Sequence, residues 1–228
     1  MSKIVLSIGG SLLNPGKPDL PYIRQTCSLL EKLKKLHTIA IVTGGGSSAR
    51  TYANAIRSLS NNEFIADEAG ISSTKQNSYL LIACLKDSAY PKVPDTFEDA
   101  AHALLTGKIV VMGGTIPGIT TDADASLLAE KINADRVINL SNVDAIYDSD
   151  PRKNKNAKKF PRLSFSELVE LATSNDQRKA GTHFIFDLLG CKIIARSKIE
   201  THFVNGKNLT DVENAINGKK HNGTIVCD

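Results

Sequence analysis

Short runs of isoleucine and valine that end directly in glycine recur along this chain of 228 residues. They occupy 3–8, 38–43 and 108–112, whereas a fourth apolar run, 136–141, ends in serine and asparagine, and 200–204 is a further candidate. Short apolar runs with such boundaries are typical of strands buried on both faces of a parallel sheet. No other feature constrains the fold as strongly.

Segments with the spacing of amphipathic helices separate these strands. Their apolar faces are formed by Ile23, Cys27, Leu30, Leu33 and Leu36, then by Ala49, Ala53, Ile56 and Leu59, and later by Leu127, Leu128 and Ile132. Two further helix starts have capping-box spacing, Ser164 with Glu167 and Thr210 with Glu213. This alternation predicts an α/β fold, a three-layer α/β/α sandwich with a mainly parallel central sheet.

Composition excludes several classes of protein. With 41% apolar and 23% charged residues, the chain has the material for one globular domain spanning 1–228. It shows no apolar stretch of about 18 residues and no secretion signal, so we expect a cytoplasmic protein without a membrane partner. The four cysteines are scattered without a CxxC pair, so neither a disulfide framework nor a zinc site is expected, and the sequence assigns no metal-ligating residue.

The net charge of +4 is spread along the chain, apart from a basic stretch at 152–162. That stretch is either a solvated loop or a surface that faces nucleotide phosphates, and its position alone does not decide between the two. The charge is too small to indicate a nucleic acid polymer as a partner.

Glycines follow the first three strands, in the sequences SIGGS (7–11), TGGGS (43–47) and MGGT (112–115). Because the carboxyl ends of parallel strands share one edge of a sheet, we expect the three turns to open onto the same crevice. Glycine lets the backbone approach an anion closely, and the amino terminus of the following helix adds partial positive charge. One glycine pair is as readily a tight turn, but three at one edge favour the binding of several phosphates. Neither a P-loop nor a GxGxxG pattern is present, so another arrangement must hold them.

Polar side chains follow these turns closely in sequence. Arg50 lies one helical turn beyond Gly46, the last glycine of the second glycine-rich segment. It is either an exposed helix arginine or a guanidinium that donates two hydrogen bonds to a phosphate. Three hydroxyls serve either ordinary turn chemistry or a ligand: Thr115, Thr120 and Thr121. Asp122 is predicted to be the N-cap of the next helix, which does not exclude a catalytic role.

The chain contains four segments in a fixed order, SIGGS, TGGGSSAR, MGGTIPGITTDADASLLAE and SNVDAIYDSDPRK. The similarity that this ordered set carries extends over nearly the whole chain. The set resembles the amino acid kinase superfamily, and the closing HNGT (221–224) adds to a particular similarity to archaeal UMP kinases. The resemblance implies transfer of the γ-phosphoryl group of ATP to UMP in pyrimidine nucleotide (CTP) biosynthesis. It also implies Mg²⁺ as the ion that accompanies ATP, and assembly as a homohexamer.

Carried over position by position, the resemblance implies two nucleotide sites. ATP would contact Ser7, Ile8, Gly9, Gly10, Ser11, Gly46, Arg50, Ser141, Asn142, Tyr147 and Asp150. UMP would contact Gly45, Asp67, Thr115, Ile116, Pro117, Gly118, Ile119, Thr120 and Thr121, with Asp67 on the ribose hydroxyls. The N-terminal half would therefore bind UMP, and the C-terminal half mainly ATP.

Two positions depart from the family pattern. Ser7 stands where many members have a lysine that stabilises the transferring phosphoryl group, and Lys75 stands where archaeal relatives often have arginine. Arg50, Lys153 or Lys179 is expected to supply the missing positive charge, and the sequence does not choose among the three.

The acceptor phosphate is already ionised, so the transfer needs no general base, and positioning with charge neutralisation should dominate. Arg50 and Asp122 are the expected catalytic residues, with Asp122 ordering the cationic groups. Two alternatives are an enzyme that acts on another small phosphate or carboxylate, since this fold serves several acceptors, and a noncatalytic nucleotide-binding module, which the serine at position 7 suggests. Asp67 and the 115–121 loop favour UMP.

Overall fold

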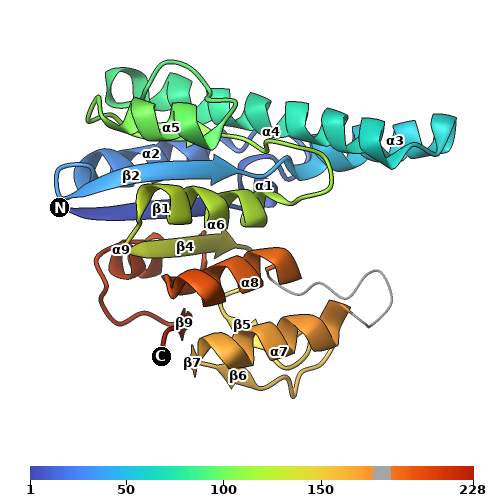
Figure 1. Ribbon diagram of the computed structural model, residues 1–228, viewed down its shortest axis with the longest axis vertical. Coiled ribbons are helices and arrows are strands. Elements are labelled where there is room, and N and C mark those ends of the chain that lie inside the picture. Colours follow the sequence, from blue (N-terminus) through green and yellow to red (C-terminus); the bar gives the residue numbers. More distant parts are fainter. Residues whose placement is uncertain (177–185) are drawn as a thin grey trace.

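A computed structural model describes residues 1–176 and 186–228 of the chain (Figure 1). In this part of the chain a seven-stranded sheet has the order β3-β2-β1-β4-β8-β9-β7. The strands are β1 (Ser2–Ile8), β2 (His37–Thr43), β3 (Val110–Met112), β4 (Arg136–Ser141), β7 (Arg162–Leu163), β8 (Glu200–Asn205) and β9 (Thr224–Val226). β1, β2, β3, β4 and β8 are parallel, whereas β9 runs antiparallel to β8. The predicted mainly parallel α/β fold is confirmed.

Helices cover both faces of the sheet (Figure 1). One face packs against α2 (Leu20–Leu33), α4 (Glu63–Leu85) and α9 (Leu209–Ile216), and the other against α5 (Phe97–Leu104) and α6 (Thr121–Ile132). α7 (Phe165–Asp176) and α8 (Leu188–Ser197) form a third apolar cluster with β8 and β9. The remaining elements are α1 (Gly10–Leu13), α3 (Gly46–Ser60), the 3₁₀ turn η1 (Lys86–Ser88) and the antiparallel pair β5 (Ile146–Tyr147) and β6 (Lys159–Phe160).

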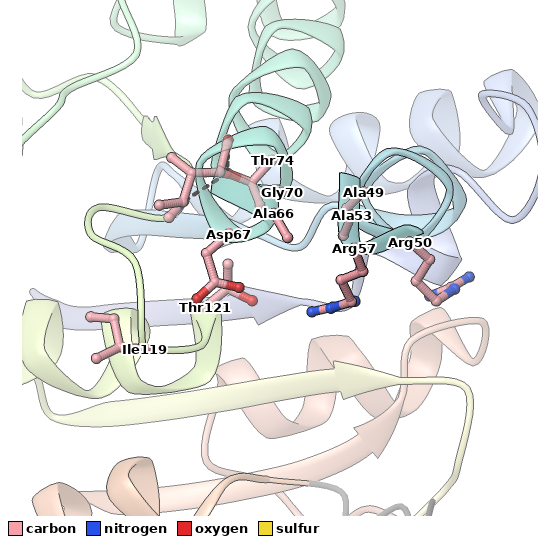
Figure 2. Close-up of a pocket in the computed structure, with 12 residues that line it drawn as sticks. Ala49, Arg50, Ala53, Arg57, Ala66, Asp67, Gly70, Thr74, Ile119 and Thr121 are labelled. Carbon is pink, nitrogen blue, oxygen red and sulfur yellow. Dashed lines mark hydrogen bonds between the residues drawn. The ribbon is translucent and has the colours of Figure 1, made fainter. Parts of the chain in front are cut away.

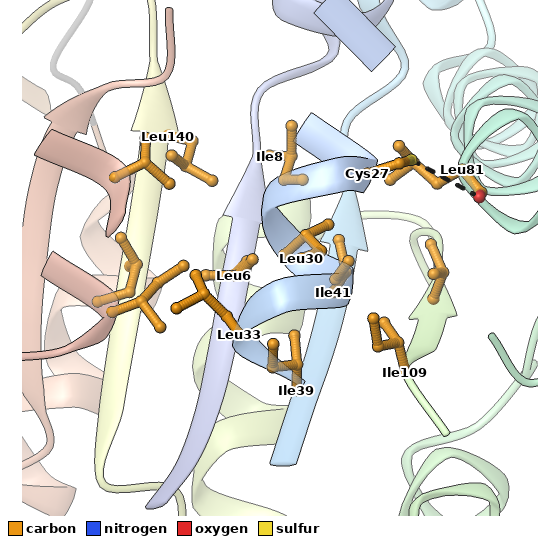
Figure 3. Close-up of a cluster of buried hydrophobic side chains, with 14 of the residues drawn as sticks. Leu6, Ile8, Cys27, Leu30, Leu33, Ile39, Ile41, Leu81, Ile109 and Leu140 are labelled. Carbon is orange, nitrogen blue, oxygen red and sulfur yellow. Dashed lines mark hydrogen bonds between the residues drawn. The ribbon is translucent and has the colours of Figure 1, made fainter. Parts of the chain in front are cut away.

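The alternation of side chains along β1 divides the core between the two faces. Leu6 and Ile8 pack under α2 with Leu30 and Leu33 (Figure 3), whereas Val5 lies in the cluster on the opposite face. All five are at most 1% exposed. Burial of a leucine or isoleucine side chain contributes roughly 1.5–3 kcal/mol, so this packing fixes the register of β1 and the place where it ends.

Helix starts agree with the sequence only in part. Ser164 and Glu167 form the predicted capping box, because each backbone N–H donates to the other side chain. The box predicted at Thr210 is wrong: Asn208 caps α9 by accepting a hydrogen bond from the N–H of Asp211. α9 therefore begins one residue before Thr210.

Two leucines assigned to buried helix faces are exposed instead. Leu36 lies just beyond the end of α2 and is 59% exposed, and Leu59 near the end of α3 is 87% exposed. α3 and α4 extend past the edge of the sheet (Figure 1), so the outer end of α3 has no core beneath it. Among the described residues, no helix combines the length and the apolar character needed to cross a bilayer.

Candidate active site

The first two glycine turns meet at the carboxyl edge of the sheet. The N–H of Gly44 donates to the carbonyl oxygen of Ile8, at 2.9 Å, and the N–H of Gly9 donates to that of Leu140, also at 2.9 Å. A Cβ on Gly10 would lie 2.1 Å from the backbone nitrogen of Gly46, so no larger residue fits there. The turns after β1 and β2 are thus in direct contact.

The third turn reaches the same edge through α4. Thr74 of α4 accepts a hydrogen bond from the N–H of Gly114 at 2.8 Å, and its carbonyl oxygen accepts one from the hydroxyl of Thr43 at 2.9 Å. Asn77, one turn later, donates to the carbonyl oxygen of Gly44 at 2.7 Å. The three glycine turns therefore meet at one edge of the sheet, as predicted, with α4 as the connecting element. That all three open onto the same crevice stays a prediction.

A pocket of about 260 Å³ lies beside this edge, between α3, α4 and the loop that follows β3 (Figure 2). Its lining residues are Ala49, Arg50, Ala53, Arg57, Ala66, Asp67, Gly70, Ile71, Thr74, Gly114, Ile119 and Thr121. The two arginines come from one side, whereas Asp67, Ile119 and Thr74 lie on the other (Figure 2). The pocket therefore has a cationic end and a polar to apolar end.

Three residues that the resemblance assigned to UMP line this pocket: Asp67, Ile119 and Thr121. Asp67 also fixes the loop, because its Oδ2 accepts a hydrogen bond from the N–H of Gly118 at 2.9 Å. Gly45 lies against the same helices, since a Cβ on it would stand 3.4 Å from the carbonyl oxygen of Gly70. The other loop residues differ in exposure: Ile116, Gly118 and Thr120 are exposed, and Thr115 and Pro117 are half-buried.

Arg50, which the resemblance assigned to ATP phosphates, lines the same pocket as Asp67. Arg57, two turns further along α3, also lines it and is held by Glu63, whose carboxylate accepts from its Nε at 2.9 Å. Sequence reasoning missed Arg57, although its seven-residue spacing from Arg50 places both on one face of a helix.

The remaining residues assigned to ATP lie outside the lining of this pocket. Most are at the ends of β1 and β4, whereas Gly46 begins α3, Tyr147 ends β5 and Asp150 follows β5. Ile8 has its side chain in the core, Gly9 and Ser11 are half-buried, and Asn142 is exposed. The hydroxyl of Ser141 donates to the carbonyl oxygen of Val143 at 3.0 Å, and that of Tyr147 donates to Asp144 at 2.9 Å. Asp150 pairs with Arg152 in the exposed turn between β5 and β6 that carries most of the basic stretch.

The prediction that Asp122 caps α6 is wrong. Thr120 is the N-cap, and its hydroxyl accepts hydrogen bonds from the N–H groups of Asp122 and Ala123. The Asp122 carboxylate is therefore free to accept from the hydroxyl of Ser7 at 2.7 Å and from the amide of Asn139 at 3.1 Å. Asp122 thus joins α6 to β1 and β4 directly behind the first glycine turn.

Burial, together with the negative charge of Asp187, raises the pKa of Asp122 to about 7, although the hydrogen bonds from Ser7 and Asn139 act in the opposite direction. Asp187 caps α8 by accepting from the N–H of Gly190, and it also accepts a hydrogen bond from the hydroxyl of Thr120. The sequence offered only a capping signal for Asp187, an aspartate before an apolar helix. Its contact with the loop after β3 depends on packing between distant segments.

The two departures from the family pattern are accommodated locally. Ser7 is buried, with its hydroxyl committed to Asp122, and Lys75 pairs with Asp95 at 2.5 Å. Of the three candidate cations, Arg50 lines the pocket and Lys153 lies in the exposed turn after β5. Lys179 lies outside the described residues.

Comparison with known proteins agrees with this architecture. The model of the amino acid kinase family matches residues 2–205. The uridylate kinases of Thermococcus onnurineus and Methanocaldococcus jannaschii are 45% and 44% identical to this chain, each over 98% of it and 99% of their own length.

Solved structures are similar over the whole chain. The uridylate kinase of Archaeoglobus fulgidus has a TM-score of 0.88 at 39% identity and is covered over its full length. The UMP kinase of Bacillus anthracis, 22% identical with a TM-score of 0.83 and 96% covered, shares the fold. The sequence, the glycine edge and these similarities together show that the chain belongs to the amino acid kinase family, among its uridylate kinases.

Proposed function

We propose that this chain is a UMP kinase, which transfers the γ-phosphoryl group of ATP to UMP and yields UDP and ADP for pyrimidine nucleotide synthesis. The observation that carries the proposal is the pocket of about 260 Å³ in which Arg50, Asp67 and the loop after β3 come together beside the glycine turns. The relatives named uridylate kinases, which match along nearly their whole length, support it.

The charge distribution of the pocket suggests how UMP binds. Arg50, with Arg57 beside it, offers the guanidinium donors that recognise a phosphate. Asp67 uses one carboxylate oxygen for Gly118, which leaves the other to accept from ribose hydroxyls. The uracil ring then extends toward Thr74, Gly114 and Ile119, at the end away from the arginines.

ATP occupies the other side of the glycine edge in this proposal. Backbone N–H groups of the turns after β1 and β2 surround its phosphates, and the helix amino termini that follow favour negative charge. Ser141, Asn142, Tyr147 and Asp150, at and beyond the end of β4, hold the nucleoside. The N-terminal half of a single domain thus binds UMP, and the C-terminal half mainly binds ATP.

The chemistry follows from positioning. Because the UMP phosphate is ionised at neutral pH, the protein aligns two phosphate chains and neutralises the charge between them, and no side chain has to remove a proton. Arg50 supplies positive charge at the acceptor, and Asp122 fixes β1, β4 and α6 at the point of transfer through Ser7 and Asn139.

Asp122 and Asp187 fit Mg²⁺ by their chemistry. Each offers carboxylate oxygens, the ligand type that Mg²⁺ prefers, and Thr120 links the two residues, since its hydroxyl donates to Asp187 and accepts from the N–H of Asp122. Mg²⁺ commonly binds through one or two carboxylates together with substrate phosphates. When bound, it would neutralise charge on the ATP phosphates, with these two residues holding it.

Self-association, as a homohexamer in the cytoplasm, is part of the same proposal. Two large apolar side chains on the outer part of α3 support it, since Tyr52 is 63% exposed and Leu59 is 87% exposed. Exposed apolar groups on a projecting helix are typical of a contact between subunits.

A panel of phosphate acceptors tests the function directly. ATP consumption is measured with a coupled assay in the presence of UMP, CMP, AMP, GMP or a small carboxylate. The proposal predicts rapid turnover with UMP and much slower turnover with every other acceptor. Faster turnover of another compound would assign a different acceptor, and nucleotide binding without turnover would indicate a noncatalytic module.

A further inference from the structure

The closing HNGT segment, 221–224, takes no part in the mechanism above, although it belongs to the sequence pattern that resembles archaeal UMP kinases. Its last residue begins β9. Three of its side chains form hydrogen bonds, each with a different part of the fold: β8, α9, or the pair of β5 and β6. The segment therefore joins elements that are far apart in the sequence.

The first two residues of the segment anchor it to the body of the domain. Nε2 of His221 and Nδ1 of His202, in β8, share a hydrogen bond of 2.7 Å. The side-chain amide of Asn222 contacts both carboxylate oxygens of Asp211, at 3.3 Å and 3.2 Å, and Asp211 is buried in α9. The backbone that leads into β9 is thus held by a strand and by a helix of the main body.

Thr224, the last residue of the segment, uses its hydroxyl to hold the β5–β6 pair. It is 0% exposed. Its Oγ1 accepts a hydrogen bond from the N–H of Ile146 in β5 at 2.9 Å and donates one to the carbonyl oxygen of Phe160 in β6 at 2.5 Å. Ile146 and Phe160 are partners in the register of the pair. One hydroxyl therefore bonds to both strands at the same position.

The β5–β6 pair depends on such contacts for its position. It forms a sheet of two strands, separate from the seven-stranded sheet, and a pair of this size is only marginally stable by itself. Ile146 and Phe160 pack against the apolar cluster of α7, α8, β8 and β9, but apolar contact has no preferred direction. Hydrogen bonds are directional, so the two bonds from Thr224 fix where the pair lies relative to the main sheet.

The same pair carries residues that the proposed function assigns to the nucleoside of ATP. Tyr147 ends β5, and Asp150 lies in the turn that joins the two strands. The hydroxyl of Tyr147 donates to Asp144 at 2.9 Å, and Lys159, its partner in the pair, donates to the same carboxylate at 2.8 Å. Contacts within the pair thus set the side chain of Tyr147, whereas Thr224 sets the place of its backbone.

We propose that Thr224 is a positioning residue for ATP. It acts by holding the backbone of β5 and β6 where the nucleoside of ATP binds, without touching either nucleotide. Loss of its hydroxyl then weakens the binding of ATP and leaves the acceptor pocket unchanged, because that pocket is built from α3, α4 and the loop after β3. This inference rests on the proposed function, since it takes the residues around β5 as part of the ATP site.

The test replaces Thr224 with valine, which has a similar shape and forms no hydrogen bonds. The N–H of Ile146 and the carbonyl oxygen of Phe160 then lose a buried partner, so the dissociation constant for ATP should rise about tenfold. Calorimetry without an acceptor measures it, and the KM for ATP should rise in parallel. The dissociation constant and the KM for UMP should not change. Thr224→Ser, which keeps the hydroxyl, should restore the affinity for ATP.

Thr201→Val is the matched control. Thr201 is also 0% exposed and lies in the same sheet, in β8, but its hydroxyl donates to the carbonyl oxygen of Ile199 at 3.0 Å. Both valine variants should lower the free energy of unfolding, and only Thr224→Val should weaken the binding of ATP. Thr224→Cys keeps the test decisive if Thr224→Val fails to fold. Its thiol packs like a small apolar group and is a weak donor, so the dissociation constant for ATP should rise by about threefold.

Two results would overturn the inference. One is an unchanged affinity for ATP in folded Thr224→Val or Thr224→Cys. The other is a loss of affinity that is equal for ATP and UMP, or equal in Thr201→Val, because Thr224 would then only stabilise the fold. The proposed function fails in a different way: wild-type protein that binds ATP, loses this affinity in Thr224→Val and transfers no phosphoryl group to UMP would support the inference and overturn the function.

Discussion

Asp67 holds the pocket together as well as lining it. Its carboxylate accepts from the N–H of Gly118, so one side chain links α4 to the loop that closes the base end. A substitution at this position therefore acts on the binding of the acceptor and leaves the sheet intact.

Asp67→Asn should raise the KM for UMP about tenfold, with a smaller effect on kcat and none on the KM for ATP. An amide accepts ribose hydroxyls less strongly than a carboxylate does, since hydrogen bonds to ionised groups are about twice as strong. Steady-state kinetics measure this, with Glu68→Gln, the exposed neighbour, as the control. An equal rise in the KM for ATP would contradict the assignment.

Asp122 has a raised pKa of about 7, compared with an ordinary value near 3.8, so the native state keeps a proton that the unfolded state has lost. The free energy of unfolding should therefore fall as the pH rises from about 4 to 7, because the unfolded state binds fewer protons in this window. Asp124, with a pKa of about 6, contributes in the same direction.

Asp122→Asn should remove part of this pH dependence and lower kcat about a hundredfold, since the amide cannot neutralise or hold cationic groups. Urea unfolding at several pH values and UDP formation measure the two effects. A variant with full activity would remove Asp122 from the mechanism, and an unaltered pH dependence would contradict its burial as an ionisable group.

At the level of elements, the sequence predicted the strands well and the helix starts less well. The runs that became β1, β2 and β4 are mainly apolar along their buried stretches, the pattern expected of strands covered on both faces. Helix starts depend on which of several nearby polar residues becomes the cap. Thr120 and Asp122 are both good N-caps within two positions, and tertiary contacts of Asp122 decided between them.

The same ambiguity at α9 yields a direct test. Asn208→Ala should lower the free energy of unfolding by about 1 kcal/mol, the usual effect of losing an N-cap, whereas Thr210→Ala should change it by less than about 0.5 kcal/mol. Chemical denaturation of both variants measures the difference. The reverse order would restore the capping box predicted from the sequence.

α3 provides a prediction about assembly. Leu59→Lys should shift the protein toward smaller oligomers, with little effect on the stability of the monomer, because Leu59 is 87% exposed and contributes little to the core. Size-exclusion chromatography with light scattering measures the mass. Leu105→Lys, at an 84% exposed leucine next to α5, is the matched control and should leave the mass unchanged. An unaltered mass in Leu59→Lys would exclude this end of α3 from the interface.

On the scale of the whole molecule, the sequence predicted where the site lies because topology fixes it. Parallel strands that end in glycine bring their turns to one edge whatever the loops do. The contact of Asp187 with Thr120 was not predictable in this way. It depends on the packing of α6 beside α8, between segments more than sixty residues apart, and no local pattern records such a contact.

The arrangement of the two substrates is the central claim, and a crystal structure with UMP and a nonhydrolysable ATP analogue tests it most directly. We predict the UMP phosphate beside Arg50, its ribose on Asp67, and the γ-phosphate of the analogue on the backbone N–H groups of the turns after β1 and β2, in line with the acceptor oxygen. Nucleotides bound on separate faces of the sheet, or a pocket left empty at saturating UMP, would contradict the account.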